Sequence, residues 1–369
     1  MQMGSVSQAR PGADPCKVMI VDDSAVVRAA LTRMCEADPG IKVVATAVNG
    51  LSAIATLKRS DVDVMLLDIE MPVMDGLTAL PELVKIAPKT KILMSSTLTL
   101  RNAEISMKAL SLGAADYVAK PTSMQDSSGL DMFQKELIAK IRILVARSLP
   151  KAPSGLFPST AAYHQNDHMK LRPVPTRGCS AVVIGSSTGG PQALMELMKG
   201  LKDLTKPIFI TQHMPPKFTT ALAHHLTGVL GRKVDEAVND QEVTPSGVYL
   251  APGDFHMRIV RSGTGYRIKL DQGPKENSCR PSVDPMFSSV SDAYAGHVLA
   301  VMLTGMGSDG LKGTEHLVRA GGALIAQDEK TSVVWGMPGA VSVAGLASAI
   351  LPLTEIARTL CTYAGLKVR

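Results

Sequence analysis

The chain has 369 residues, of which 45% are hydrophobic and 20% charged, a composition that excludes a disordered protein and leaves room for two globular domains. The formal net charge of +6 comes from scattered lysines and arginines, and only 4% of the residues are aromatic, so no nucleic-acid-binding surface is indicated. Five dispersed cysteines, a start unlike a signal peptide and no apolar run of roughly 18 residues predict a cytoplasmic protein without membrane insertion.

The first half alternates short apolar runs with helical segments, which predicts five βα units on a parallel sheet, an α/β fold of the doubly wound kind. The expected strands are 18–21, 41–47, 62–67, 92–94 and 117–119. The expected helices are 26–35, 51–59, 77–86 and 102–112, followed by a longer helix over 130–148. In such sheets ligands bind at the carboxyl ends of the strands, so the residues just after each strand carry the functional interest.

Polar residues stand at several of these strand ends, namely Asp22, Asp23, Asp68, Ser96, Thr97 and Lys120. Three carboxylates in one pocket repel one another unless a cation lies among them, which indicates a hard, oxygen-seeking ion such as Mg²⁺. Each residue alone is also a common turn or cap residue. The set as a whole favours a functional site.

This part of the chain resembles the receiver domain of response regulators. The resemblance covers about 16–149 and rests on Asp22-Asp23, Leu67-Asp68-Ile69-Glu70-Met71-Pro72, Ser96 and Tyr117-Val118-Ala119-Lys120-Pro121. It implies that Asp68 accepts a phosphoryl group and that Asp22 and Asp23 bind Mg²⁺ with it. It also implies that Lys120 contacts the phosphoryl group, that Ser96 is the hydroxyl that moves toward it, and that Tyr117 is an aromatic switch. Because Ser95, Ser96 and Thr97 are consecutive hydroxyl residues, the residue that supplies this hydroxyl is defined only to within one position.

Prolines and small polar residues fill 150–178, which predicts a linker between a domain over 16–149 and a second domain over 179–369. The second region opens with a buried-strand pattern that ends in Gly185-Ser186-Ser187-Thr188-Gly189-Gly190-Pro191. The spacing Gly185-x-Ser187-x-Gly189 is that of an elbow that presents a nucleophilic serine. A phosphate-binding loop and a plain glycine-rich turn remain alternatives, although the Gly-Lys-Ser/Thr ending of the former is missing.

Two further strand ends carry a histidine and an aspartate. An apolar run over 207–212 ends at His213, and another over 298–304 leads to Asp309. A serine nucleophile needs a neighbouring base, and the base needs a carboxylate to orient it, so Ser187, His213 and Asp309 fit these roles. Other histidines compete, namely His224, His225, His256, His297 and His316, of which His256 suits a supporting or substrate-side position. The segments 247–253 and 266–270 are expected to form strands of a hairpin region.

The second region is similar to the catalytic domain of chemotaxis protein-glutamate methylesterases, an α/β parallel-sheet hydrolase. The similarity covers 179–369 and rests on five ordered motifs, namely 185–191, 212–215, 251–257, 280–284 and 303–310. It implies Ser187 as nucleophile, His213 as general base and acid, and Asp309 as the orienting carboxylate. It further implies an oxyanion hole from the N–H groups near Thr188 and Met306, and no cofactor for the esterase reaction. Ser186 and Cys279 depart from the commoner alanine and histidine. Neither is expected to touch the triad, and Cys279 is expected to alter the substrate rim.

The two resemblances together imply a phosphorylation-regulated enzyme. It would hydrolyse γ-methyl esters of glutamate on the cytoplasmic helices of chemoreceptors, releasing methanol, and would also deamidate receptor glutamines. A chemotaxis histidine kinase would phosphorylate Asp68 with Mg²⁺ bound in the receiver. The competing hypothesis is a non-enzymatic two-component output protein that binds partners or nucleic acid, and the absence of a helix-turn-helix pattern disfavours it.

Overall fold

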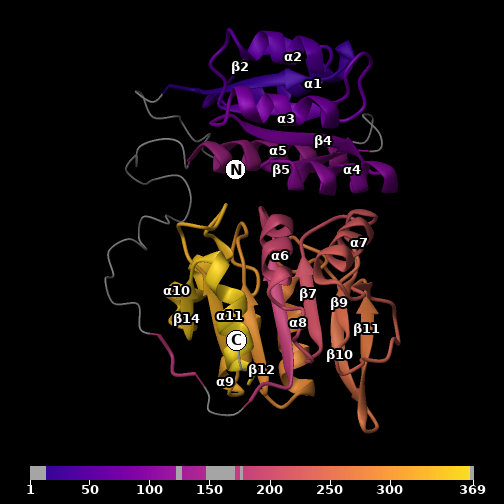
Figure 1. Ribbon diagram of the computed structural model, residues 1–369, viewed down its shortest axis with the longest axis vertical. Helices are drawn as coiled ribbons and strands as arrows, with labels where there is room; N and C mark the ends of the chain where they lie inside the picture. The colour runs from indigo at the N-terminus through magenta and orange to yellow at the C-terminus, as the bar shows by residue number, and fades with distance from the viewer. Residues whose placement is uncertain (1–13, 122–126, 147–170, 175–177, 366–369) are drawn as a thin grey trace, which may run out of the picture. The chain divides into compact units, whose positions relative to one another are not determined.

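The computed structural model describes residues 14–121, 127–146, 171–174 and 178–365. The chain divides into two compact units, 1–159 and 160–369. In Figure 1 the first unit runs from indigo to magenta and the second from magenta to yellow. Most of the predicted linker, 150–178, lies outside the described residues. No helix in the described part of the chain has both the length and the apolar character needed to cross a bilayer.

The first unit is a five-stranded parallel sheet in the order β2-β1-β3-β4-β5. Its strands are β1 (Cys16–Val21), β2 (Ile41–Ala47), β3 (Val64–Asp68), β4 (Lys91–Thr97) and β5 (Asp116–Lys120). Its helices are α1 (Ala25–Glu36), α2 (Gly50–Leu57), α3 (Gly76–Ile86), α4 (Leu100–Ser111) and α5 (Ser127–Ala146). The predicted doubly wound fold is confirmed, and the observed ends differ from the expected ones by a few residues.

Local sequence explains where these elements begin and which parts are buried. The apolar runs of β1 and β3 are almost wholly buried, as expected for inner strands of a parallel sheet that has helices on both faces. A side-chain oxygen caps the first turn of four helices, from Ser24, Asn49, Asp75 and Thr99. The chain runs from β1 outward to β2 and then returns to β3, so the strand order reverses between β1 and β3. In open sheets a binding crevice forms at such a reversal.

The second unit contains a seven-stranded parallel sheet in the order β14-β13-β12-β6-β7-β9-β8. The strands are β6 (Ala181–Ser186), β7 (Ile208–Gln212), β8 (Asp235–Glu236), β9 (Val248–Leu250), β12 (Val298–Met302), β13 (Ala323–Gln327) and β14 (Ala349–Leu351). The helices are α6 (Gly190–Lys199), α7 (Phe218–Leu230), α8 (Val283–Ala293), α9 (Leu311–Arg319), α10 (Met337–Val343) and α11 (Leu353–Tyr363).

The strand order of this sheet reverses between β6 and β12. The chain moves from β6 to β7 and β9, and then crosses back to β12, β13 and β14 on the other side. β6, β7 and β12 are buried along their whole length because they lie in the middle of the sheet. Helices α6, α7 and α11 pack together, and α8, α9 and α10 form a second packed group. The fold therefore brings the carboxyl ends of β6 and β12 together at a second crevice.

The predicted hairpin is wrong in one of its two strands. Val248–Leu250 is not a hairpin strand but pairs in parallel with β7 inside the main sheet. The hairpin forms instead between β10 (His256–Ser262) and β11 (Gly265–Asp271). β10 is less conspicuous in the sequence because only its first part is buried, whereas the short apolar run of β9 is typical of an inner parallel strand.

Candidate active site and phosphorylation site

Ser187 lies at the crevice between β6 and β12, directly after β6. Its N–H donates to the carbonyl of Thr304, which follows β12, over 3.0 Å. A Cβ atom on Gly305 would lie 2.9 Å from the Cβ atom of Ser187, so only glycine allows the two loops to approach this closely. Gly189 starts α6 with a φ of 74°, a conformation that glycine adopts readily. The serine is half-buried and faces the crevice edge of the sheet.

Ser186, the neighbouring serine, is fully buried and has a structural role. Its hydroxyl donates to Oε1 of Gln212 over 2.7 Å. The Gln212 side chain in turn donates from Nε2 to the carbonyls of Ser187, over 2.9 Å, and of His213, over 3.2 Å. Gln212 therefore ties the serine loop to the end of β7, and of the two serines Ser187 alone has access to solvent.

His213, which is partly buried, pairs with the buried Asp309 across the ends of β7 and β12. Nε2 of His213 lies 2.7 Å from Oδ2 of Asp309. Burial alone would lower the pKa of His213, but the hydrogen bond to Asp309 and the contact with Cys279 outweigh it and raise that pKa above 6.5. For Asp309 burial acts to raise the pKa, and the hydrogen bond with His213 outweighs it, so the pKa of this carboxyl is lowered. Both shifts favour an imidazolium held by a carboxylate.

Asp309 is fixed by several donors besides His213. Its oxygens accept hydrogen bonds from the Ser282 hydroxyl and the Asn277 amide, each over 2.7 Å, and from the N–H of Val283 over 2.6 Å. Its own neighbour Gly310 adds an N–H donor at 2.9 Å. A carboxylate with so many donors stays ionised and cannot rotate, which is the requirement for orienting a histidine.

The second ring nitrogen of His213 contacts a thiol. Nδ1 lies 3.5 Å from Sγ of Cys279, and this thiol, rather than the Ser187 hydroxyl, is the hydrogen-bond partner of Nδ1 within the described residues. The sequence prediction put Cys279 at the substrate rim, and the structure puts it against the histidine. His213 and Asp309 are thus paired directly, while Ser187 is positioned beside them through its backbone.

Thr188 and Met306 offer backbone N–H groups on the two sides of Ser187. Within the described part of the chain neither N–H has a hydrogen-bond partner. The two loops are linked because the Thr304 hydroxyl donates to the Thr188 carbonyl over 2.9 Å. Free N–H groups on adjoining loops are suited to hold a developing negative charge on an oxygen atom.

His256 supports the site from outside it. The ring is buried, with Nε2 3.0 Å from the carbonyl of Pro274, and Nδ1 accepts a hydrogen bond from the N–H of Ser282 over 3.3 Å. His256 therefore holds both ends of the loop that delivers Ser282 and Asn277 to Asp309. Of the other competing histidines, His316 pairs at the surface with Asp292, over 2.6 Å.

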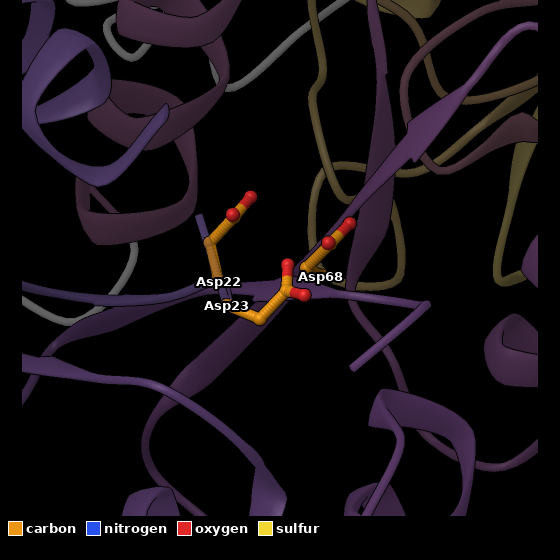
Figure 2. Close-up of side chains that lie close together, drawn as sticks. All are labelled: Asp22, Asp23 and Asp68. Carbon is orange, nitrogen blue, oxygen red and sulfur yellow. The ribbon is translucent and has the colours of Figure 1, made fainter. Parts of the chain in front are cut away.

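The first unit carries an acidic cluster at its own crevice, made of Asp22, Asp23 and Asp68. Oxygen atoms of all three carboxylates lie within 4.8 Å of one another (Figure 2). Nζ of Lys120 lies 2.7 Å from Oδ2 of Asp22 and 2.6 Å from Oδ1 of Asp68. Burial raises the pKa of Asp68 to about 6, Lys120 offsets part of the rise, and Asp22 adds to it.

These residues fit Mg²⁺. The donors are hard carboxylate oxygens, two of the carboxylates are buried, and burial, with a further contribution from Asp22, raises the pKa of Asp68 despite the contact with Lys120. A divalent cation among the three oxygens would relieve this repulsion.

Ser96 and Tyr117 are buried near this cluster but have other partners. The Ser96 hydroxyl accepts a hydrogen bond from the Ser106 hydroxyl of α4 over 3.2 Å. The Tyr117 ring has Nζ of Lys140 at 4.7 Å from its centroid. Among the neighbours, Thr97 is exposed and accepts a hydrogen bond from the Asn102 amide over 2.7 Å. Ser96 is thus tied to α4 in this state.

Comparison with known proteins agrees with both halves of this description. The family model of the CheB methylesterase matches residues 182–360, and that of the response regulator receiver domain matches 18–128. A protein-glutamate methylesterase/protein-glutamine glutaminase of Azospirillum brasilense is 52% identical over 361 residues, which are 94% of this chain and 92% of that protein. A relative with the same description in Paramagnetospirillum magneticum is 48% identical over 96% of this chain and 97% of its own length.

The chain belongs to the CheB methylesterase family. Membership confirms the sequence prediction of family, architecture and enzyme class. Among solved structures, the catalytic domain of Thermotoga maritima CheB is 41% identical to this chain. It matches 50% of this chain and 99% of that domain, with a TM-score of 0.49.

Several site residues of this CheB-family chain were not found from the sequence. Gln212 and Ser282 lie inside motifs that carry the family resemblance, so a signal for them existed. Asn277 lies outside those motifs, and only the folded loop reveals its contact with Asp309.

Proposed function

We propose that this protein hydrolyses γ-methyl esters of glutamate side chains on chemoreceptor helices and deamidates receptor glutamines, under control of phosphorylation at Asp68. The observation that carries the esterase part is the His213–Asp309 pair, 2.7 Å apart, at the same sheet edge as the accessible Ser187. The names of the relatives support the choice of glutamate esters and glutamine amides as substrates.

The geometry supports a serine hydrolase mechanism in which Nδ1 of His213 is the catalytic nitrogen, since Nε2 faces Asp309. The Ser187 oxygen attacks the ester carbonyl carbon while its proton passes to Nδ1. The N–H groups of Thr188 and Met306 stabilise the oxyanion. The imidazolium then protonates the departing methoxide, methanol leaves, and an acyl-enzyme ester remains on Ser187.

Water completes the cycle. His213 takes a proton from a water molecule, which attacks the acyl carbon, and the proton returns to the Ser187 oxygen as the free glutamate carboxylate departs. A glutamine side chain follows the same route with ammonia as the first leaving group. Asp309 stays ionised throughout and stabilises each imidazolium. None of these steps calls for a cofactor.

The acidic cluster supports phosphorylation of Asp68 by a histidine kinase. Asp22, Asp23 and Asp68 would hold Mg²⁺, which supplies positive charge to neutralise the incoming phosphoryl group. Lys120 already contacts Asp68 and would bind a phosphoryl oxygen. Ser96 would leave Ser106 to reach the phosphoryl group, and Tyr117 would change its position as the aromatic switch.

The proposal is tested by methanol release from receptor membranes that carry methylated glutamates. Ser187→Ala should reduce the rate to near background, since loss of a triad serine costs about a million-fold in kcat. Ser186→Ala is the matched control, because that hydroxyl is buried against Gln212, and it should keep most of the rate. Equal losses in the two variants, or an active Ser187→Ala protein, would reject the assigned nucleophile. No methanol release from the unaltered protein would favour a non-enzymatic output domain.

A further inference from the structure

The His213 ring contacts Cys279 on one side and Asp309 on the other. These are the three residue types of a cysteine catalytic triad. Sγ of Cys279 is 3.5 Å from Nδ1 of His213, and Nε2 of the same ring is 2.7 Å from Oδ2 of Asp309. A nucleophile within reach of a base, with the base oriented by a third group, is the arrangement that activates cysteine. Nδ1 of His213 therefore contacts the Cys279 thiol, and in the proposed mechanism the same nitrogen takes the Ser187 proton.

The loop conformation fixes the thiol at this position. Cys279 and Glu276 exchange both backbone hydrogen bonds, over 2.8 and 3.1 Å, so the four residues of 276–279 form a closed turn. Both central residues have positive φ, 50° at Asn277 and 64° at Ser278, as in the tight turns of hairpins. The adjacent Arg280 is anchored by two hydrogen bonds to Asp254, over 2.9 and 2.7 Å. The contact with His213 is thus built into the loop.

Cys279 differs from the other cysteines in its surroundings. All five cysteines of the chain lie within the described residues, and the other four, Cys16, Cys35, Cys179 and Cys361, are buried. Burial raises the pKa of each of these four thiols, which keeps them protonated and unreactive. Cys279 is half-buried and reachable from solvent. Only at Cys279 do access and a neighbouring base coincide.

We propose that Cys279 is a covalent modification site of this enzyme, at which His213 activates the thiol toward peroxides and small electrophiles and modification of the sulfur stops ester hydrolysis. The first half of this inference rests on the contacts above. The second half rests on the proposed function, because it requires His213 to serve Ser187.

The reaction with hydrogen peroxide balances as follows. The Cys279 proton passes to Nδ1 of His213, and the thiolate sulfur attacks one peroxide oxygen. An S–O bond forms and the O–O bond breaks, so sulfur is oxidised to a sulfenic acid. The departing hydroxide takes the imidazolium proton and leaves as water. With iodoacetamide an S–C bond forms and iodide departs.

Either product places new atoms next to Nδ1, where the Ser187 proton must arrive. Modification therefore separates base from nucleophile while leaving Ser187 and Asp309 chemically unchanged. A sulfenic acid is reversible by thiols, so the peroxide effect is a reversible switch.

The first test measures alkylation of the folded full-length protein by iodoacetamide at pH 6, followed by mass spectrometry of each cysteine. A free thiol is only about 0.3% ionised at this pH, so a base that takes the thiol proton at 3.5 Å should make alkylation about tenfold faster or more. We expect Cys279 to react at least tenfold faster than a cysteine in an unfolded peptide. His213→Ala should remove this advantage. A rate equal to that of the peptide, or one unaffected by His213→Ala, would overturn the first half.

The second test compares methanol release before and after treatment with hydrogen peroxide, each protein being scaled to its own untreated rate. The unaltered protein should lose at least tenfold and recover with dithiothreitol. Cys279→Ser and Cys279→Ala should each retain their untreated rate. Cys361→Ser is the matched control, since its sulfur lies in a buried contact with the Gly200 carbonyl, and it should remain as sensitive as the unaltered protein. Equal losses with and without Cys279 would overturn the second half.

The two proposals fail in different ways. An active Ser187→Ala variant rejects the esterase mechanism, whereas the alkylation rate of Cys279 and its dependence on His213 do not involve ester hydrolysis at all.

Discussion

Replacing Asp68 by asparagine should stabilise the receiver domain of the unphosphorylated, Mg²⁺-free protein at pH 7. Asp68 is 8% exposed, and burial raises its pKa from 3.8 to about 6. Between these pH values the folded state binds more protons than the unfolded chain, so stability falls as pH rises, and above pH 6 the whole penalty is present. A rise of about two pH units corresponds to about 3 kcal/mol. The pKa of about 6 already includes the attraction to Lys120, so removal of the charge by asparagine should stabilise the folded state by up to about 3 kcal/mol.

Amide hydrogen exchange in the full-length protein gives this quantity for the receiver domain alone. Peptides from β1 and β3 report its opening free energy without a contribution from the second domain. The measurement is made at pH 7 with a chelator, and again near pH 4, where protonated Asp68 should make the two proteins nearly equal. Asp61→Asn is the matched control, because that carboxylate lies at the surface with its side chain 82% exposed, and it should leave the exchange of β1 and β3 unchanged.

The effect of Mg²⁺ on receiver stability is a second test of the repulsion among Asp22, Asp23 and Asp68. Because the ion binds the folded protein, it should stabilise the unaltered receiver and have a much smaller effect on Asp68→Asn. The reasoning is refuted if Asp68→Asn is less stable than the unaltered protein at pH 7 without Mg²⁺. That result would mean that the attraction between Asp68 and Lys120 exceeds the cost of burying the carboxylate.

Four further outcomes are expected in methanol-release and unfolding assays. Asp309→Asn should lower kcat by about 10⁴ and, because it removes the charge that raises the pKa of His213, move the acidic limb of kcat/KM to lower pH. Ser186→Ala should lower the free energy of unfolding of the second domain by about 1 to 2 kcal/mol, since a buried acceptor is left unpaired. Asp68→Asn should abolish the rise in rate caused by acetyl phosphate with Mg²⁺. A fragment beginning near Arg177 should be faster than the unphosphorylated full-length protein and indifferent to acetyl phosphate, and a fragment that is no faster would exclude inhibition by the receiver.

The inner strands of the two sheets could be predicted because buried parallel strands have a recognisable apolar pattern in the sequence. Inner parallel strands such as β6, β7 and β12 are buried on both faces and read as continuous apolar runs. The rule that chemistry lies at strand ends then pointed to Ser187 and His213 without knowledge of the strand order. β10 escaped this approach, since it is buried only in its first part, and β9, which lies inside the expected strand 247–253, was assigned to a hairpin instead of the main sheet.

The surroundings of Asp309 could not be predicted from the sequence. Its donors come from Asn277, Ser282 and the N–H of Val283, which lie 32, 27 and 26 residues away along the chain. They meet the carboxylate only because the first residue of α8 and the loop before it fold against Asp309, which follows β12. No periodicity or spacing reports such a contact. The segment 280–284 could be recognised as a motif in the sequence, but its contacts with Asp309 could not be predicted.

The orientation of His213 illustrates why the position of a residue does not determine its chemistry. Sequence position predicts that a histidine follows β7, but not which ring nitrogen faces the carboxylate. Because Nε2 contacts Asp309, the proposed mechanism uses Nδ1 as the base, and the residue that contacts Nδ1 becomes decisive. That residue is Cys279, which stands where histidine is commoner and which the sequence analysis assigned to the substrate rim. The orientation of the His213 ring thus puts Cys279 next to the nitrogen that the proposed mechanism uses as the base, and the reactivity of this thiol measures how His213 is oriented.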